Sequence, residues 1–215
     1  MIIASSLRSA SLAVLCVAAL GVAHPVQARV HAFHAQRGSQ GVTHVGGTVP
    51  NGQGGVVHAR GTSVSGPSGT AVHGAYTSVN PDGSVQHQGG TQIHGANGGS
   101  FSGSNSYTRN ADGSASSSHN AYGTTANGGV VSSNGSYSRG SDGSLSGSSQ
   151  TSASSPKGSY NASTSTANGI TNHNTSITNA NGDSYNGQTT YTKGQGITHS
   201  GSCTDASGNV ISCSH

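Results

Sequence analysis

The chain lacks tryptophan and glutamate, and only 4% of its 215 residues are aromatic. From Arg29 onward, its large apolar residues are one Leu, five Ile, thirteen Val and two Phe. So few large side chains cannot fill the core of a conventional globular domain. The five aspartates all lie in or beside glycine-containing turns, so turn formation explains them and carboxylate pairs for acid–base catalysis are missing.

Catalytic and cofactor-binding motifs are also absent from the sequence. There is no GxSxG elbow, no separate Ser-His-Asp arrangement, no P-loop, and no GxGxxG between a strand and a helix. We therefore expect that the protein is not an enzyme and carries no cofactor. After residue 28 the chain has seven basic and five acidic residues without a basic stripe, so we expect no nucleic-acid partner.

The first 28 residues have the features of a signal peptide that is removed on export. Arg8 is the only charge of a short n-region, an apolar run extends from Leu12 to Ala23, and Val26-Gln27-Ala28 is a small-residue cleavage site. The apolar run is shorter than the roughly 20 residues that cross a bilayer. We expect a chain that begins at Arg29, has no membrane span, and is secreted, periplasmic or held at the cell surface.

Two cysteines, Cys203 and Cys213, follow the predicted signal peptide. In an exported chain this even number predicts a disulfide. A three-residue loop centred on Gly208 would place the two cysteines directly opposite each other, within bridging distance. The alternative is a metal site completed by His199 and His215, which requires reduced thiolates. We expect residues 201–215 to form a disulfide-closed hairpin.

Turn dipeptides recur every 15 residues in the middle of the chain, and parts of the segment at 96–109 recur at 136 and at 180–193. Asn-Gly and Asp-Gly favour the type I′ turns that join neighbouring antiparallel strands. The pattern predicts an all-β fold, a repetitive antiparallel hairpin meander with about 15 residues per strand and turn over residues 51–200. The alternatives are a β-solenoid and a largely disordered chain, and residues 29–50 are expected to be a flexible His-containing arm. The dipeptides are Asp82-Gly83, Asn97-Gly98, Asp112-Gly113, Asn127-Gly128 and Asp142-Gly143.

Two-residue loops at these turns would set the register of the sheet. Tyr107 then lies opposite Ser118, which lies opposite Tyr137, and the large side chains gather on one face. Serines such as Ser102, Ser104 and Ser136, together with His119, lie on the other face. A sheet with a thin apolar face and unpaired edges is suited to self-association. The predicted interaction face consists of Phe101, Tyr107, Arg109, Tyr122, Tyr137 and Arg139.

Histidine is the residue type that suggests a metal site. His44, His58, His73 and His87 are spaced by 14, 15 and 14 residues. Neutral imidazoles at one level of a sheet can bind zinc or copper. The predicted register pairs His73 with Gln92, however, so the four rings do not converge. A polar residue that recurs within a degenerate repeat is the simpler interpretation.

Together these features predict a secreted structural repeat protein of the cell surface or extracellular matrix that self-associates. The alternative is a secreted module that binds metal or glycan, through the His-rich segment or through the face that carries tyrosine and arginine.

Overall fold

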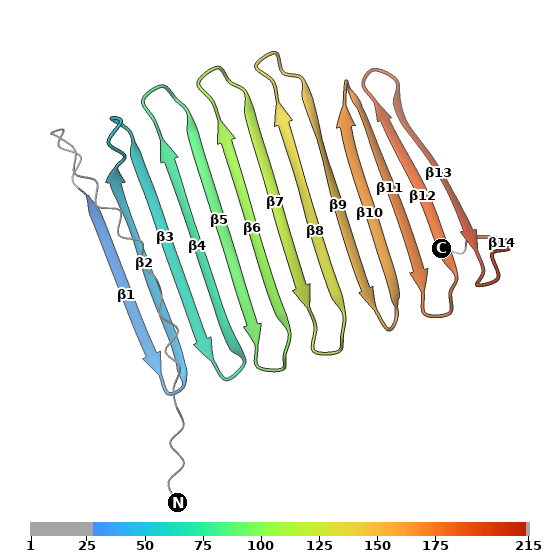
Figure 1. The fold of residues 1–215 in the computed structure, drawn as a ribbon, viewed down its shortest axis with the longest axis horizontal. Helices are drawn as coiled ribbons and strands as arrows, with labels where there is room; N and C mark the ends of the chain where they lie inside the picture. The colour runs from blue at the N-terminus through green and yellow to red at the C-terminus, as the bar shows by residue number, and fades with distance from the viewer. Residues whose placement is uncertain (1–27, 214–215) are drawn as a thin grey trace, which may run out of the picture.

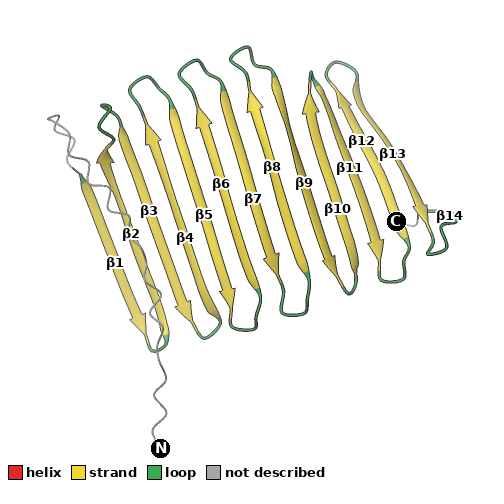
Figure 2. Cartoon of the chain, in the orientation of Figure 1, coloured by secondary structure: helices red, strands yellow, loops and turns green. Residues whose placement is uncertain are grey.

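The computed structural model describes residues 28–213, which form a single sheet of fourteen strands (Figure 1). The strands follow one another across the sheet in chain order, each antiparallel to its neighbours, and the described residues include no helix (Figure 2). The predicted all-β hairpin meander is therefore confirmed. The predicted signal peptide (apart from Ala28) and His215 lie outside the described residues. The strands are β1 (Arg29–Arg37), β2 (Gln40–Pro50), β3 (Val56–Gly66), β4 (Gly69–Val79), β5 (Val85–Gly95), β6 (Ser100–Arg109), β7 (Ala115–Thr124), β8 (Val130–Arg139), β9 (Leu145–Ser155), β10 (Gly158–Ala167), β11 (Ile170–Asn179), β12 (Ser184–Thr192), β13 (Gly196–Thr204) and β14 (Val210–Ile211).

Residues 29–50 do not form the expected flexible arm. They form β1 and β2, which pair along their length from Arg29 opposite Thr48 to Arg37 opposite Gln40. Gly38, with a φ of 59°, makes the tight turn between them possible. β2 is also paired with β3 on its other side, so its backbone is held along both edges.

The five Asp-Gly and Asn-Gly turns are not of type I′. At Asp112-Gly113, only the glycine has a positive φ, of 83°. The amide of Gly113 donates to the carbonyl of Asn110 at 3.1 Å, and the amide of Asn110 donates to the carbonyl of Ser114 at 2.8 Å. This geometry is a type I turn followed by a glycine bulge. Asn168-Gly169 does have the predicted type I′ dihedrals, with φ values of 54° and 76°.

The extra loop residue shifts the register of each bulged hairpin by one. Tyr107 lies opposite Ser117 rather than Ser118, and Ser117 lies opposite Tyr137. Two successive shifts cancel, so Tyr107 and Tyr137 share a face as predicted. In the strand between them, β7, a register shift of one residue moves every side chain to the opposite face of the sheet. Tyr122 therefore lies on the face predicted for His119, and His119 on the face predicted for Tyr122.

The sheet is a single layer, and both of its faces are open. Directly opposite residues share a face and successive residues alternate, so each strand residue can be assigned to one side. We call the side that carries Phe101, Tyr107 and His119 face A, and the other side face B. Among the described residues, Ala162, at 9% exposure, is the only buried residue apart from the glycines Gly46, Gly123 and Gly129.

Rings that lie over glycines on face A replace part of the missing core. A Cβ at Gly103 would stand 3.1 Å from the ring of Phe101, and a Cβ at Gly201 would stand 2.8 Å from the ring of Tyr185. Each glycine leaves a hollow into which a ring from its own or a neighbouring strand fits. Apolar area is buried in this way without a second layer of structure.

Candidate functional site: two uncovered sheet faces

A row of mostly apolar residues crosses face A near one end of the strands. Phe101 lies opposite Ile93 on one side and Gly123 on the other, and the same level continues to both edges of the sheet. The members from β1 to β5 line a shallow depression of about 580 Å³. We call this set the apolar row: Ala35, Val42, Val64, Ala71, Ile93, Phe101, Gly123, Val131, Ala153, Tyr160, Ile177, Tyr185, Cys203 and Ile211.

Five of the six residues of the predicted interaction face lie on face A. Phe101 belongs to the apolar row, whereas the other four stand nearer the opposite end of the strands: Tyr107, Arg109, Tyr137 and Arg139. Nη2 of Arg109 donates to the carbonyl of Gly83 at 3.0 Å, so this arginine ties a neighbouring turn to the sheet. Tyr122 lies on face B, and its assignment to the interaction face was wrong because the glycine bulge turns β7 over.

Histidines on face A pair with threonines directly across the strands. Nδ1 of His44 lies 2.8 Å from Oγ1 of Thr62, and Nδ1 of His73 lies 2.9 Å from Oγ1 of Thr91. At another level, His58 pairs with Thr48 and His87 with Thr77 in the same way. The order from β2 to β5 is His-Thr-His-Thr at one level and Thr-His-Thr-His at the other.

The four histidines predicted as metal ligands thus share a face but occupy two separate levels. Within residues 28–213, no three His, Cys, Asp or Glu side chains are placed so that they could hold one ion. The His–Thr pairs themselves were missed at the sequence level, although spacing signals them. Threonine precedes histidine by ten residues at 48 and 58, at 77 and 87, and at 189 and 199.

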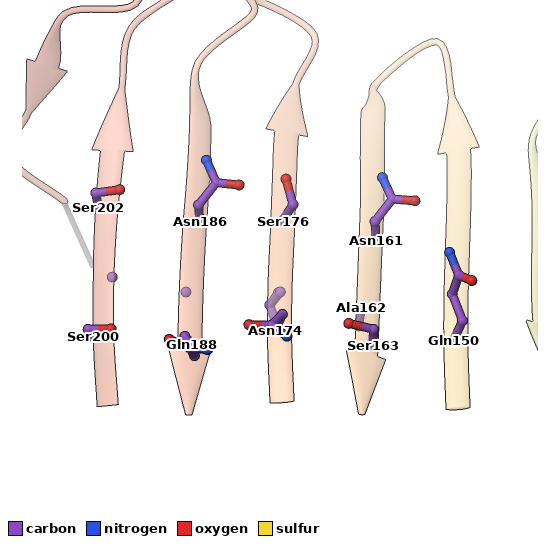
Figure 3. A pocket seen from close by; sticks show the side chains of 13 residues that line it. Gln150, Asn161, Ala162, Ser163, Asn174, Ser176, Asn186, Gln188, Ser200 and Ser202 are labelled. Carbon is purple, nitrogen blue, oxygen red and sulfur yellow. The ribbon is translucent and has the colours of Figure 1, made fainter. Parts of the chain in front are cut away.

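Face B carries no Asp, Lys or Arg on β1–β13, and from β6 onward it consists mainly of Ser, Thr, Asn and Gln. A trough of about 600 Å³ crosses β9–β13 on this face (Figure 3). Gln150, Asn174 and Gln188 line one level of the trough, and Asn161 and Asn186 line the next. These amides can both donate and accept hydrogen bonds without a charge.

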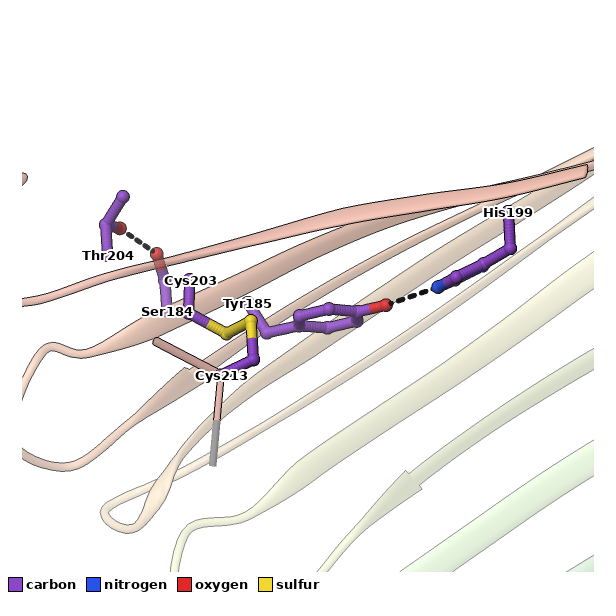
Figure 4. The surroundings of a disulfide bond; sticks show 6 residues. All are labelled: Ser184, Tyr185, His199, Cys203, Thr204 and Cys213. Atoms are coloured by element: carbon purple, nitrogen blue, oxygen red, sulfur yellow. Dashed lines mark hydrogen bonds between the residues drawn. A yellow bond between two sulfur atoms is a disulfide. The ribbon is translucent and has the colours of Figure 1, made fainter. Parts of the chain in front are cut away.

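The predicted disulfide between Cys203 and Cys213 is present, with Cα atoms 5.4 Å apart (Figure 4). The predicted pairing of the two cysteines was wrong, because Cys203 lies opposite Ile211. The loop begins at Asp205, whose amide donates to the carbonyl of Asn209, and it is another bulged turn. β14 covers only Cys203 and Thr204 of β13, so the disulfide anchors a strand of two residues.

The aspartates of the bulged turns accept hydrogen bonds from the residue two positions later. The side chain and amide of Ser114 hold the pKa of Asp112 below its ordinary value. Ser84 lowers the pKa of Asp82, and Ser144 that of Asp142, through the same two groups. These contacts identify the carboxylates as parts of turns.

The geometry defines a class of protein, a single-layer antiparallel meander with two unlike open faces. Face A combines the apolar row with histidine and arginine, whereas face B lacks Asp, Lys and Arg on β1–β13 and is mainly polar from β6 onward. No family model matches the chain, and no curated protein or solved structure matches it. None of the described residues forms a helix that is both long and apolar enough to cross a membrane.

Proposed function

We propose that the protein is an exported structural component of the cell surface or extracellular matrix, and that its copies pack together through face A. The observation that carries the proposal is the apolar row, which crosses the whole sheet. Exposed large hydrophobic residues in it include Val64, Ile93 and Val131. No part of residues 28–213 covers this row, since the described chain is one layer. An exposed apolar surface of this extent is typical of an interaction site.

A second copy of the chain is the partner that fits the apolar row. A straight row is self-complementary. If two copies are related by a two-fold axis that runs along the row, each residue of the row in one copy faces the same row in the other copy. With strands about 4.8 Å apart, the row is roughly 60 Å long. A contact three side-chain levels wide then buries about 800 Å² per copy, the size of a standard stable interface.

Charge determines how far two such faces can overlap. All five arginines of β1–β13 lie on face A, and Arg109 and Arg139 stand at the end of the strands opposite the apolar row. Complete overlap of two A faces would bring these like charges near one another, which costs electrostatic energy. Overlap along the apolar row alone keeps Arg109 and Arg139 of the two copies apart, while Arg37 at the edge strand is the one arginine beside the row. We expect this staggered packing.

Two isoleucines on β11 provide the test. Ile177 lies in the apolar row on face A, Ile170 lies on face B, and they are 43% and 41% exposed. In sedimentation velocity over a range of concentrations, Ile177→Ser should weaken self-association by about tenfold. Ile170→Ser should leave it unchanged. A chain that stays monomeric at every accessible concentration, or equal effects of the two variants, would contradict the proposal.

Export is tested separately, by mass spectrometry of the protein recovered outside the cytoplasm. We expect its first residue to be Arg29. A chain that retains the preceding residues would refute the processing step without bearing on how the sheets pack.

The trough on face B supports a second candidate function, the binding of an uncharged glycan. Its amides would meet sugar hydroxyls, and the strand spacing of about 4.8 Å is close to the length of one sugar ring along an extended chain. Co-sedimentation with insoluble neutral polysaccharides would measure binding. Asn174→Ala with Gln188→Ala should abolish it, whereas Asn105→Ala on face A should not. Binding that is lost equally in Ile177→Ser would contradict a separate site on face B.

A further inference from the structure

Two histidine rings converge above a glycine at the first edge of the sheet. His31 on β1 and His44 on β2 are stacked, with ring centroids 5.6 Å apart and 30° between the ring planes. His31 lies directly opposite Gly46, two residues beyond His44 on β2. Both histidines point to face A, and Gly46 between them is buried. The absence of a side chain at residue 46 leaves a space that both rings border.

One nitrogen of each ring faces this space. Nε2 of His31 and Nε2 of His44 lie 2.9 and 3.5 Å from the point where a Cβ of residue 46 would stand. Nδ1 of His44 is already engaged, 2.8 Å from Oγ1 of Thr62. When Nδ1 donates its proton to Thr62, Nε2 carries the free electron pair, which is the form of imidazole that binds metal.

We propose that His31 and His44 bind one divalent late transition-metal ion, Cu²⁺ or Zn²⁺, through their Nε2 atoms above Gly46. Small rotations of the two rings bring both nitrogens to the distance of about 2.1 Å that such an ion requires. Water completes the coordination shell, and Cu²⁺ binds more tightly than Zn²⁺. The site uses only two protein ligands at the surface, so the fold does not depend on it. The inference does not rest on the proposed packing of face A.

Arg60 is the charged residue that opposes this site. It lies opposite Gly46 on β3 and therefore on the same face. A cation bound between His31 and His44 is repelled by its guanidinium group. Replacement by an uncharged residue of similar length, Arg60→Gln, should tighten metal binding several-fold.

The other histidines of face A lack the second ring. His73 pairs with Thr91 as His44 pairs with Thr62, which makes it a matched control. Among the described residues, however, the stacked pair of His31 and His44 is the only such pair of rings. The even spacing of His44, His58, His73 and His87 therefore does not mark the site. The partner of His44 is His31, which stands outside that series.

The test is calorimetric titration of Cu²⁺, and separately of Zn²⁺, into the chain from Arg29 to His215. A short extension before Arg29 blocks an amino-terminal chelate, because a free amino group with histidine at the third position binds Cu²⁺ by itself. We expect one ion per chain. His31→Gln and His44→Gln should each weaken binding at least tenfold, and His73→Gln should not. Gly46→Ala should also weaken binding, because its methyl group occupies the space between the two nitrogens.

Circular dichroism of every variant checks that the sheet is intact. Loss of binding in His73→Gln equal to that in His44→Gln would overturn the proposal, as would binding that survives His44→Gln. Binding seen only without the extension, and unaffected by His44→Gln, would assign the metal to the amino terminus instead. Absence of binding to the blocked chain at millimolar metal would also overturn it.

Discussion

Oη of Tyr185 lies 3.1 Å from Nε2 of His199, and the tyrosine ring reaches it across Gly187 and Gly201 (Figure 4). Nδ1 of His199 lies 2.9 Å from Oγ1 of Thr189, so the imidazole is engaged at both nitrogens. The ring covers backbone while its polar tip is satisfied, an arrangement that suits tyrosine on an open sheet. The contact ties β12 to β13 beside the disulfide.

The glycines under such rings should tolerate substitution less well than open ones. Gly201→Ala places a methyl group 2.8 Å from the ring of Tyr185, so the ring must move and β13 should lose about 1 kcal/mol of local stability. Gly74 has no atom closer than 3.9 Å to such a methyl group, and Gly74→Ala should stabilise β4 by about 0.5 kcal/mol. Hydrogen exchange of both strands would measure the two effects. Effects of the same sign would contradict this account.

The cross-strand His–Thr pairs should make a measurable contribution to the sheet. A double-mutant cycle on His73 and Thr91 should give a coupling energy of about 0.5–1 kcal/mol, typical of a favourable cross-strand pair. His94 and Ser100 are also directly opposite, but no hydrogen bond joins their side chains, so they form the control cycle. Coupling near zero for His73 and Thr91, or equal coupling in both cycles, would show that the hydrogen bond is energetically irrelevant.

The turns should weaken in acid. Hydrogen bonds lower the folded-state pKa of Asp82, Asp112 and Asp142 relative to the unfolded chain. Their contribution is therefore fully present above the ordinary aspartate pKa of about 3.9 and is lost as pH falls through the lowered folded-state values. Denaturant midpoints between about pH 5 and pH 2 should show this loss. Asp112→Asn with Asp142→Asn should flatten the acid limb, and an unchanged profile would refute the assignment.

The disulfide should stabilise β14 but contribute little to the stability of the rest of the sheet. In Cys203→Ser with Cys213→Ser, β14 has only two paired residues to keep it in place, which is too few for a stable strand. Amide exchange at Val210 and Ile211 should become fast, while β1–β12 keep their protection. The far-ultraviolet spectrum should hardly change. Loss of protection across the whole sheet would instead make the bridge essential to the fold.

Much of the architecture could be predicted from the turn and strand preferences of neighbouring residues. Aspartate and asparagine before glycine favour turns, and serine, threonine and valine between them favour strands, so an antiparallel meander follows without knowledge of distant contacts. Two cysteines after a predicted export signal similarly predicted their bridge. These features depend on neighbouring residues, which is why sequence alone determined them. The expected flexible arm failed because strand formation by residues 29–50 depends on pairing with β3.

The tertiary structure alone decided which side chains meet. An Asp-Gly turn can be of type I′ or a type I turn with a bulge, and the two differ by one residue of register. That one residue moved Tyr122 to face B, brought His73 opposite Thr91 instead of Gln92, and aligned Phe101 with Ile93 in the apolar row. The convergence of His31 and His44 over Gly46 likewise requires β1 and β2 to be paired. The sequence by itself determined that strands and turns alternate, whereas the register, set by backbone dihedrals summed over thirteen connections, decided what each face carries.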